Sequence, residues 1–323
     1  MKSACPPVLL LVFNRPDLGA QVFERVRQVR PDRLFIAADG PRPDRLGEAD
    51  LCTESRRIVE RVDWPCEVKT LFREQNLGCR KAISAAVTWF LENVESGVIL
   101  EDDCLPDPTF FRFCEELLVR YSEDERVMAI SGNHFQRPSF DPGGSYYFSI
   151  YPHCWGWATW RRAWQHYDDN MVDWPSARET GWLNGLMQKP EIADYNKRVF
   201  DVAHQGRVDS WAYRWTYACM RNSGLAVLPC INLVTNIGFD DRSTHTAANM
   251  EFLQIRSGVM PFPLRHPVTV TRNFDADLYS AYHVFRVPRF PRLCALRQLL
   301  VTKIVLCRYL AWRLWNRIMS IFM

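Results

Sequence analysis

The chain has 323 residues, of which 47% are hydrophobic and 13% aromatic, so it can bury one large core or two modest ones. Its formal net charge of +3 argues against a general nucleic-acid-binding protein, which would carry a strongly basic surface. We find no internal repeat and no low-complexity segment.

Strand and helix patterns alternate along the first 131 residues. Apolar runs predict the strands, and apolar residues spaced three to four apart predict the helices between them. The strands are expected at Val8–Phe13, Arg33–Ala38, Glu67–Phe72, Val98–Leu100 and Val127–Ser131. The helices are expected at Asp17–Arg30, at Leu51–Val62, after Asn76-Leu77-Gly78 and after Pro108. This alternation is typical of an α/β fold with a doubly wound, mostly parallel sheet.

Polar residues follow three of these strands. They are Asn14 and Arg15 after the first strand, Asp39 at the end of the second, and Glu101, Asp102 and Asp103 at the end of the fourth. If the first strand is central and the fourth lies beside it, these residues line one ligand-binding crevice, because the strand order reverses there. Three adjacent carboxylates repel one another, and a divalent cation that carries a nucleotide diphosphate is the simplest positive partner.

The second half, from about Gly132 to Asn273, is less periodic and rich in aromatic residues. Strands are expected at Tyr146–Tyr151 and Leu225–Leu228, and helices at Glu191–Gln205 and Trp211–Ser223. We expect this half to form a second lobe that closes over the crevice and belongs to the same domain.

The cysteine pattern favours a reducing environment. The chain has eleven cysteines, an odd number, and no Cys-x-x-Cys pair. Cys114, Cys219 and Cys307 lie in predicted apolar elements, where a reduced thiol behaves as a small hydrophobic group. We expect neither a disulfide framework nor a zinc site. The run Val8–Phe13 is too short for a signal-peptide core, so we expect a cytoplasmic protein.

Four segments of the first half together resemble the nucleotide-sugar-binding half of GT-A glycosyltransferases. The resemblance depends on Val8–Arg15, the strand end at Asp39, the turn Asn76-Leu77-Gly78 and the motif Val98–Asp103. It is closest to family-2-like bacterial enzymes and to N-acetylglucosaminyltransferase I, whose metal motif is also Glu-Asp-Asp. The resemblance implies that residues 1–131 bind the nucleotide-sugar and that residues 132–277 bind the acceptor and carry the catalytic residue. Residues 278–323 form a basic, apolar tail.

The resemblance implies Mn²⁺ or Mg²⁺ as cofactor and a UDP-sugar as donor. Asp103 would be the metal ligand, and Glu101 and Asp102 would contact hydroxyls of the ribose and the donor sugar. Carboxylates suit both tasks, because their oxygens bind hard cations and accept hydrogen bonds. Asn14 and Arg15 would hold the base and the ribose or phosphate; the alternative for this pair is a turn at the end of the strand.

Three further residues are candidates for the site, Asp39 and Asp209 from the resemblance and Arg80 from its position at a helix start. Asp39 would contact uracil, or it caps a turn. Arg80 lies at a helix start, where the macrodipole favours anions, so a bound phosphate would relieve that conflict. Asp209 matches the position of the catalytic base, although an aspartate directly before a helix is also a good N-cap. Asp201 is the alternative base.

An aromatic segment and one histidine complete the predicted site. The segment Cys154-Trp155-Gly156-Trp157-Ala158 resembles the part of the family that shapes the donor-sugar and acceptor pocket. Trp155 and Trp157 would stack on sugar rings and Gly156 would permit close approach, with core packing as the alternative. His245 would reach the metal or the diphosphate from a late loop, and a purely structural role is its alternative.

The C-terminal tail is basic. From Leu278 onward there are eight basic residues and no acidic ones, which leaves a charge of −5 on the rest of the chain. Leu299–Met323 is strongly apolar, but one lysine and three arginines interrupt it, and such charges are costly across a bilayer. Two tryptophans and these charges suit a helix that lies on an anionic membrane surface. The alternative is a helix packed on the body or in a homodimer.

We therefore predict a metal-dependent, inverting glycosyltransferase that moves a hexose from a UDP-sugar to a cell-envelope glycan or a lipid-linked acceptor. It would act at the inner face of the membrane. One alternative is a sugar-nucleotidyltransferase, although that class is expected to have a glycine-rich, lysine-containing loop where Asn14-Arg15-Pro16-Asp17 stands. The other is a haemolysin-like, non-enzymatic membrane-binding protein with a degenerate transferase body. The intact acids count against this second alternative.

Overall fold

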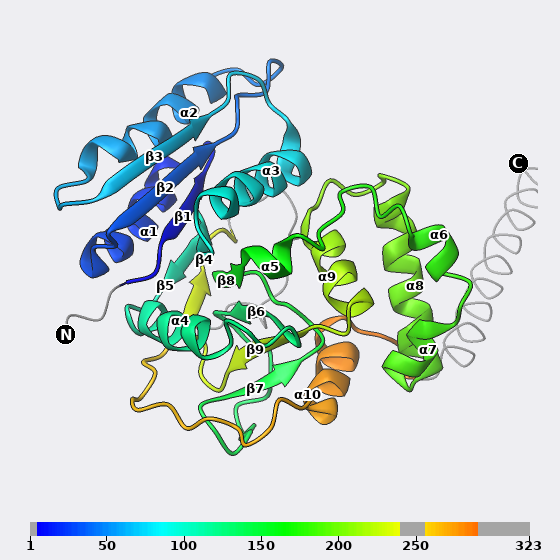
Figure 1. Cartoon of the computed structure of the whole chain (residues 1–323). Coiled ribbons are helices and arrows are strands. Elements are labelled where there is room, and N and C mark those ends of the chain that lie inside the picture. The colour runs from blue at the N-terminus through cyan, green and yellow to red at the C-terminus, as the bar shows by residue number, and fades with distance from the viewer. Residues whose placement is uncertain (1–4, 240–255, 290–323) are drawn as a thin grey trace, which may run out of the picture.

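An eight-stranded, mostly parallel sheet forms the centre of the protein. The computed structural model describes residues 5–239 and 256–289 (Figure 1). Across the sheet the strands are β3 (Glu67–Phe72), β2 (Arg33–Ala38), β1 (Val8–Val12), β4 (Ser96–Glu101), β8 (Trp157–Trp160), β6 (Val127–Ser131), β9 (Leu225–Pro229) and β7 (Tyr146–Ser149). The strands β8 and β7 run antiparallel to their neighbours, and the other pairs are parallel. The predicted mostly parallel α/β sheet is confirmed, and it is compatible with a doubly wound fold.

Helices cover both faces of this sheet (Figure 1). On one face lie α1 (Pro16–Val29), the 3₁₀ turn η1 (Arg57–Arg61) and α4 (Thr109–Arg120). On the other lie α3 (Gly78–Asn93), α5 (Arg161–Trp164) and α9 (Ala212–Arg221). The helix α2 (Glu48–Arg56) packs on α1. Strand β1 is apolar at every position because its residues alternate between these two cores.

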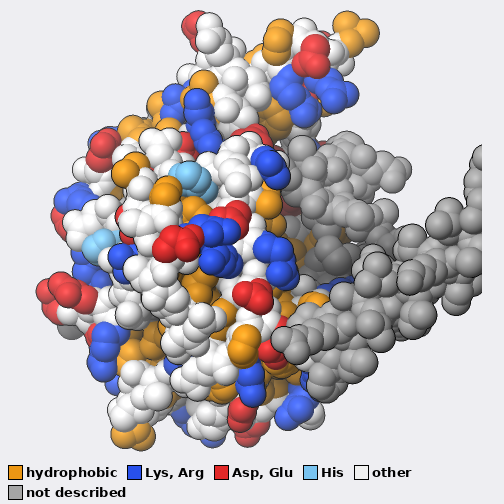
Figure 2. All heavy atoms as spheres, turned by 90° about the vertical axis from the view of Figure 1, so that its right-hand side faces the viewer, with side chains coloured by type: hydrophobic (Ala, Val, Ile, Leu, Met, Phe, Trp, Pro, Cys, Tyr) orange, Lys and Arg blue, Asp and Glu red, His pale blue; other side chains and the backbone are white. Residues whose placement is uncertain are grey.

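A third core lies outside the sheet, among short helices of the second half. These are α6 (Trp174–Ala177), α7 (Trp182–Met187) and α8 (Pro190–His204), which stand beyond α9 in Figure 1. Basic and acidic side chains are interspersed among the described residues on that side of the molecule (Figure 2). Arg178 pairs there with Asp201, and Arg221 pairs with Asp173. This mixed surface agrees with the small net charge of the chain.

The strand β8 was not predicted, and it joins the two halves of the chain. It lies between β4 and β6, with Trp157 beside Ile99 on one side and beside Ser131 on the other. A second, two-stranded sheet pairs β5 (Cys104–Pro106) with β10 (Val234–Asn236). Both pairings connect β4, or the strand β5 that follows it, to segments that are distant in sequence.

Other predicted elements are present with shifted ends. The helix expected at Leu51–Val62 begins at Glu48 and finishes as the 3₁₀ turn η1. The strand expected at Tyr146–Tyr151 ends at Ser149, where the chain turns toward α10 (Phe274–Tyr279) and the π-helical turn η3 (Ser280–Val284). The Ser149 hydroxyl donates a hydrogen bond to Asp277 of α10.

Within the described residues, no helix is both long and apolar enough to cross a membrane. The predicted membrane-surface segment Leu299–Met323 lies outside the described residues.

Gly97 in β4 provides a test of how closely α3 packs on the sheet. A Cβ atom at Gly97 would overlap the Phe90 ring of α3 and lie 2.6 Å from the carbonyl oxygen of Pro7. We expect Gly97→Ala to lower the free energy of unfolding by about 2 kcal/mol, because both neighbours are fixed in the core. Urea denaturation would measure the change.

The matched control is Gly185→Ala in α7, where nothing lies within 4 Å of the added atom. Alanine is favoured over glycine inside a helix, so this variant should be as stable as the wild type or more stable by about 0.5–1 kcal/mol. Equal effects at the two positions would contradict the packing described for β4.

Candidate functional site

The acidic motif lies at the carboxyl end of β4, directly beside the end of β1. The backbone N–H of Phe13 donates to Oδ2 of Asp102 at 3.1 Å. Arg15 Nη1 pairs with Oδ2 of Asp103, also at 3.1 Å. The Glu101 carboxylate accepts no hydrogen bond from any residue that the structure describes. The prediction that the first and fourth strands bring these side chains together is confirmed.

Burial and neighbouring carboxylates raise the pKa of Glu101 and of Asp102. Burial raises the pKa of Glu101 to about 8, and the carboxylates of Asp103 and Asp102 act in the same direction, against Arg15. Burial likewise raises the pKa of Asp102, with Asp103 as the second cause. Three carboxylates thus share one ion-paired arginine, and the local field favours a further cation.

The acids fit a cation that arrives with a nucleotide better than a cation held by protein ligands alone. Among the described residues, no group of three or more His, Cys, Asp or Glu side chains is placed to hold a metal ion. Mg²⁺ in nucleotide sites takes one or two carboxylates and completes its shell with phosphate oxygens and water. Asp103, half-buried and already facing the cation Arg15, can serve as such a ligand.

The second predicted metal ligand, His245, lies outside the described residues. The chain that leads toward it does pass the acids. The N–H of Ile237 donates to the carbonyl oxygen of Asp103 at 2.8 Å. A Cβ atom at Gly238 would lie 2.8 Å from that of Asp103 and 2.9 Å from Arg15 Nη1. The described part of this segment therefore runs against the Arg15–Asp103 pair.

Asn14 belongs to a polar cluster that the sequence did not reveal. Its Nδ2 donates to Oε1 of Glu48 at 2.9 Å, and Glu48 also forms an ion pair with Arg42. The Arg42 guanidinium lies over the ring of Phe13, 5.6 Å from its centroid. Burial opposes ionisation of Glu48, but the bonds from Arg42 and Asn14 outweigh it and lower the pKa of this carboxyl. The loop between β2 and α2 thus supports the end of β1.

Two carboxylates hold the N-terminus of α3. Asp39 accepts hydrogen bonds from the backbone N–H groups of Leu77 and Gly78 at 3.0–3.1 Å. Asp209 accepts from those of Cys79 at 3.0 Å and Arg80 at 3.1 Å. These four groups would otherwise lack partners, because helix termini leave their first N–H groups unbonded. The structure assigns Asp39 the capping alternative, and its contact with uracil remains a prediction.

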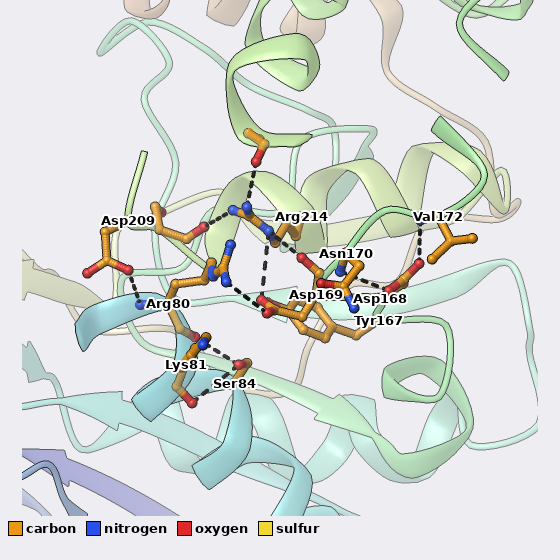
Figure 3. Close-up of polar contacts among 12 residues, drawn as sticks. Arg80, Lys81, Ser84, Tyr167, Asp168, Asp169, Asn170, Val172, Asp209 and Arg214 are labelled. Atoms are coloured by element: carbon orange, nitrogen blue, oxygen red, sulfur yellow. Dashed lines mark hydrogen bonds and ion pairs between the residues drawn. The ribbon is translucent and has the colours of Figure 1, made fainter. Parts of the chain in front are cut away.

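This arrangement corrects two expectations. Asp209 does not cap α9, which follows it in sequence, but caps α3, which lies about 130 residues earlier. The anions at the start of α3 are carboxylates, which removes the helix-terminus argument for a phosphate at Arg80, and phosphate contact by Arg80 stays a prediction. The Arg80 side chain instead pairs with Asp169 at 3.4 Å (Figure 3).

Asp169 and Arg214 are site residues that sequence reasoning missed. Arg214 is 1% exposed and donates to the backbone carbonyl groups of Asp169 at 2.7 Å and Ser210 at 2.9 Å. It thereby holds the loop that carries Asp209 (Figure 3). One signal was present in the sequence: Arg214 occupies the apolar stripe of α9, between Trp211 and Ala218. Asp169, in an irregular segment, gave no signal.

The start of α3 lies close to the β4 acids. Burial raises the pKa of the Cys79 thiol, and the carboxylates of Glu101, Asp209, Asp103 and Asp39 raise it further. The charges of four predicted site residues therefore act on the first turn of α3, and two of them, Asp39 and Asp209, bond it directly. Asp201, the alternative base, is instead engaged by Arg178 at 2.8 Å, in the third core region.

The aromatic segment divides into packing residues and one accessible ring. Trp157 is 1% exposed and stacks on Trp211, with 5.2 Å between the ring centroids. It is therefore a core residue and has no free face for a sugar. Gly156 has a φ of +60°, and a Cβ atom there would lie 2.7 Å from Val234 Cγ2. Trp155 is only partly buried, with Phe239 5.5 Å away, and it remains the candidate for sugar stacking.

No model of a known protein family matches the chain, and no curated protein sequence matches it. The likeness to GT-A glycosyltransferases therefore stays an expectation that depends on the sequence motifs.

The capping role of Asp209 can be measured independently of any activity. We expect Asp209→Ala to lower the free energy of unfolding by about 1 kcal/mol, because two N–H groups of α3 lose their acceptor. Chemical denaturation should show this loss, whereas Asp194→Ala, at an exposed position of α8, should leave stability within about 0.5 kcal/mol of the wild type. Unchanged stability in the Asp209 variant would show that the cap contributes nothing.

Proposed function

We propose that the chain is a metal-dependent, inverting glycosyltransferase of the GT-A type that uses a UDP-sugar. One observation carries the proposal: three carboxylates meet at the switch point between β1 and β4, and among the described residues Arg15 is the arginine ion-paired with them. In open α/β sheets this position is where ligands bind. A cation bound to a diphosphate would balance the excess negative charge.

On the donor side, each residue has a task that follows from its contacts. Asp103 would hold Mn²⁺ or Mg²⁺ against the diphosphate, and the metal would supply charge neutralisation of the leaving group. Glu101, which accepts no hydrogen bond from the described residues, is free to accept bonds from sugar or ribose hydroxyls. Asp102 is tied to the N–H of Phe13 and keeps the end of β1 in place. Arg15 would face the phosphates.

On the acceptor side, Asp209 is the base in this proposal. Its side chain is exposed, and its two bonds to α3 occupy one lone pair on each oxygen. The remaining lone pairs can take the proton of an acceptor hydroxyl. The hydroxyl oxygen then bonds to the anomeric carbon while the bond from that carbon to the diphosphate oxygen breaks, and the configuration inverts.

The acceptor class in this proposal is inferred from the sequence of the C-terminal tail. A cell-envelope glycan or lipid-linked acceptor at the inner face of the membrane is supported by the basic tail of the sequence, which lies outside the described residues beyond position 289. A sugar-nucleotidyltransferase is disfavoured, because Asn14-Arg15 and the Glu48–Arg42 pair occupy the exit of β1 in place of a glycine-rich loop. A membrane-binding protein without activity remains the non-enzymatic alternative.

Donor binding can be tested by thermal unfolding with a set of nucleotide-sugars, with and without Mn²⁺. A UDP-sugar present at a hundred times its Kd should stabilise the protein by about 2.7 kcal/mol, and the shift in Tm should require the metal. Asp103→Asn should remove the metal-dependent part of the shift and leave the fold intact.

Asp194→Asn on α8 controls for the loss of one negative charge and should behave as the wild type. If no UDP-sugar raises the Tm in a metal-dependent way, the proposed function is wrong. Binding of membranes without binding of any nucleotide-sugar would favour the non-enzymatic alternative.

The base can be tested separately once a donor is known. Asp209→Asn keeps an oxygen that accepts one α3 N–H but cannot take a proton, so donor affinity should remain while transfer falls by at least a hundredfold, as expected for a general base. Product formation from radiolabelled UDP-sugar, measured beside donor affinity, distinguishes the two effects. Retained turnover would assign the base elsewhere.

A further inference from the structure

Asn133, directly after β6, is buried without partners for its side chain. Its exposed fraction is 0%, and neither its amide nitrogen nor its amide oxygen has a hydrogen-bond partner among the described residues. Buried polar groups in proteins are almost always bonded, since leaving them unpaired costs free energy. An apolar residue of similar shape would therefore suit the fold better than asparagine at this position.

His153 is a second buried residue whose side chain has an atom without a hydrogen-bond partner among the described residues. His153 is 9% exposed, and its Nε2 is buried without a hydrogen-bond partner in the described part of the chain. The Ser131 hydroxyl donates to the carbonyl oxygen of His153 at 2.7 Å, which places His153 against the end of β6. Burial lowers the pKa of His153 to about 3, so its ring is neutral, with one ring nitrogen that can donate a hydrogen bond and one that can accept.

The strand pairing places Asn133 on the same edge of the sheet as the acids. Trp157 of β8 lies beside Ile99 of β4 and Ser131 of β6. The strand pairs of β8 end at this point; continued by two residues in the same direction, the register would bring Glu101, Trp155 and Asn133 side by side. The bond from the N–H of Gly132 to the carbonyl oxygen of Gly156, at 2.7 Å, shows that the β6–β8 pairing continues in this direction.

Aromatic rings frame this position. The Phe135 ring lies 5.0 Å from Trp155 and 4.7 Å from His153, both edge to face. Trp155 is the partly exposed member of the group, and Phe239 contacts its other side at 5.5 Å. A sugar ring can stack its C–H face on an aromatic ring. Its hydroxyl groups can form hydrogen bonds with unpaired amide and imidazole groups.

We propose that Asn133 and His153, together with Trp155, form a subsite that binds the hydroxyl groups of a sugar ring beside Glu101. The subsite rests on the proposed function and adds to it the residues that recognise the sugar. The Asn133 amide supplies one donor and one acceptor, which match a pair of neighbouring hydroxyls. Because Asn133 is covered, sugar contact requires a neighbouring side chain to move, and the continued register would place Trp155 beside it.

The sugar can be that of the donor or that of the acceptor, and titration calorimetry distinguishes the two. UDP, UDP-glucose, UDP-galactose and UDP-N-acetylglucosamine are titrated in the presence of Mn²⁺, and free hexoses and disaccharides are titrated with UDP present. In Asn133→Leu the affinity for the sugar-bearing ligand should fall at least tenfold, while the affinity for UDP stays as in the wild type. His153→Phe should show the same split.

Thermal unfolding supplies a second readout that needs no ligand. Asn133→Leu should have a Tm equal to or higher than that of the wild type, because unpaired buried polar atoms are removed. The matched control is Asn196→Leu in α8, a residue 3% exposed whose Nδ2 donates to the carbonyl oxygen of Ile192 at 2.9 Å. This control should lower the Tm and leave sugar affinity unchanged. Asn133→Ala removes the amide without adding volume and should repeat the binding result.

Each outcome decides the proposal. If Asn133→Leu lowers the Tm as much as Asn196→Leu, the amide has a structural partner such as buried water, and the subsite is overturned. UDP binding together with unchanged sugar affinity in the Asn133 and His153 variants overturns the subsite but spares the proposed function. Asn133-dependent binding of sugars without any UDP binding overturns the proposed function but supports the subsite. No binding of any ligand to the wild type overturns both.

Discussion

The backbone pairing of β8 with both β4 and β6 is the interaction on which the rest of the structure depends. This short antiparallel strand connects the first four strands to those of the second half and makes one sheet from both. Its first residue, Trp157, is held by stacking on Trp211, so the strand cannot shift without opening the aromatic core. The pairing also brings the segment that precedes β8, which contains Trp155, to the carboxyl ends of β4 and β6. Without β8, the acids and the aromatic segment would have no fixed relation.

A second link between the halves is electrostatic. The N-terminus of α3, in the first half, receives Asp209 from the second half, and Arg80 of the same helix pairs with Asp169. Arg214 holds both loops through backbone carbonyl groups, which is why an arginine is stable there at 1% exposure. The base in the proposed reaction is thus placed by a helix terminus and not by its own helix. Positioning and catalysis would use different lone pairs of the same carboxylate.

The candidate site holds groups that the fold alone does not favour. Glu101 and Asp102 are partly buried beside Asp103 with one paired arginine, and burial raises the pKa of both. Asn133 and His153 keep polar atoms without partners among the described residues. Such local conflicts are expected at functional sites, where a ligand supplies the missing partner. Glu101, Asp102 and Asn133 lie at the carboxyl ends of β4 and β6, where the proposed sugar nucleotide would lie.

The alternation of strands and helices, the central place of β1 beside β4, and the meeting of Arg15 with the acids all followed from the sequence, because periodicity and the rules for parallel sheets act locally. The sequence could not distinguish Trp155 from Trp157, nor reveal β8, since four residues rich in tryptophan carry no usable period. Nor could it show that Asp209 caps α3, or that Asn14 bonds Glu48 and Asn133 bonds no described residue. These partners lie far apart in the chain, and only the packing of the two halves brings them within bonding distance or keeps them apart.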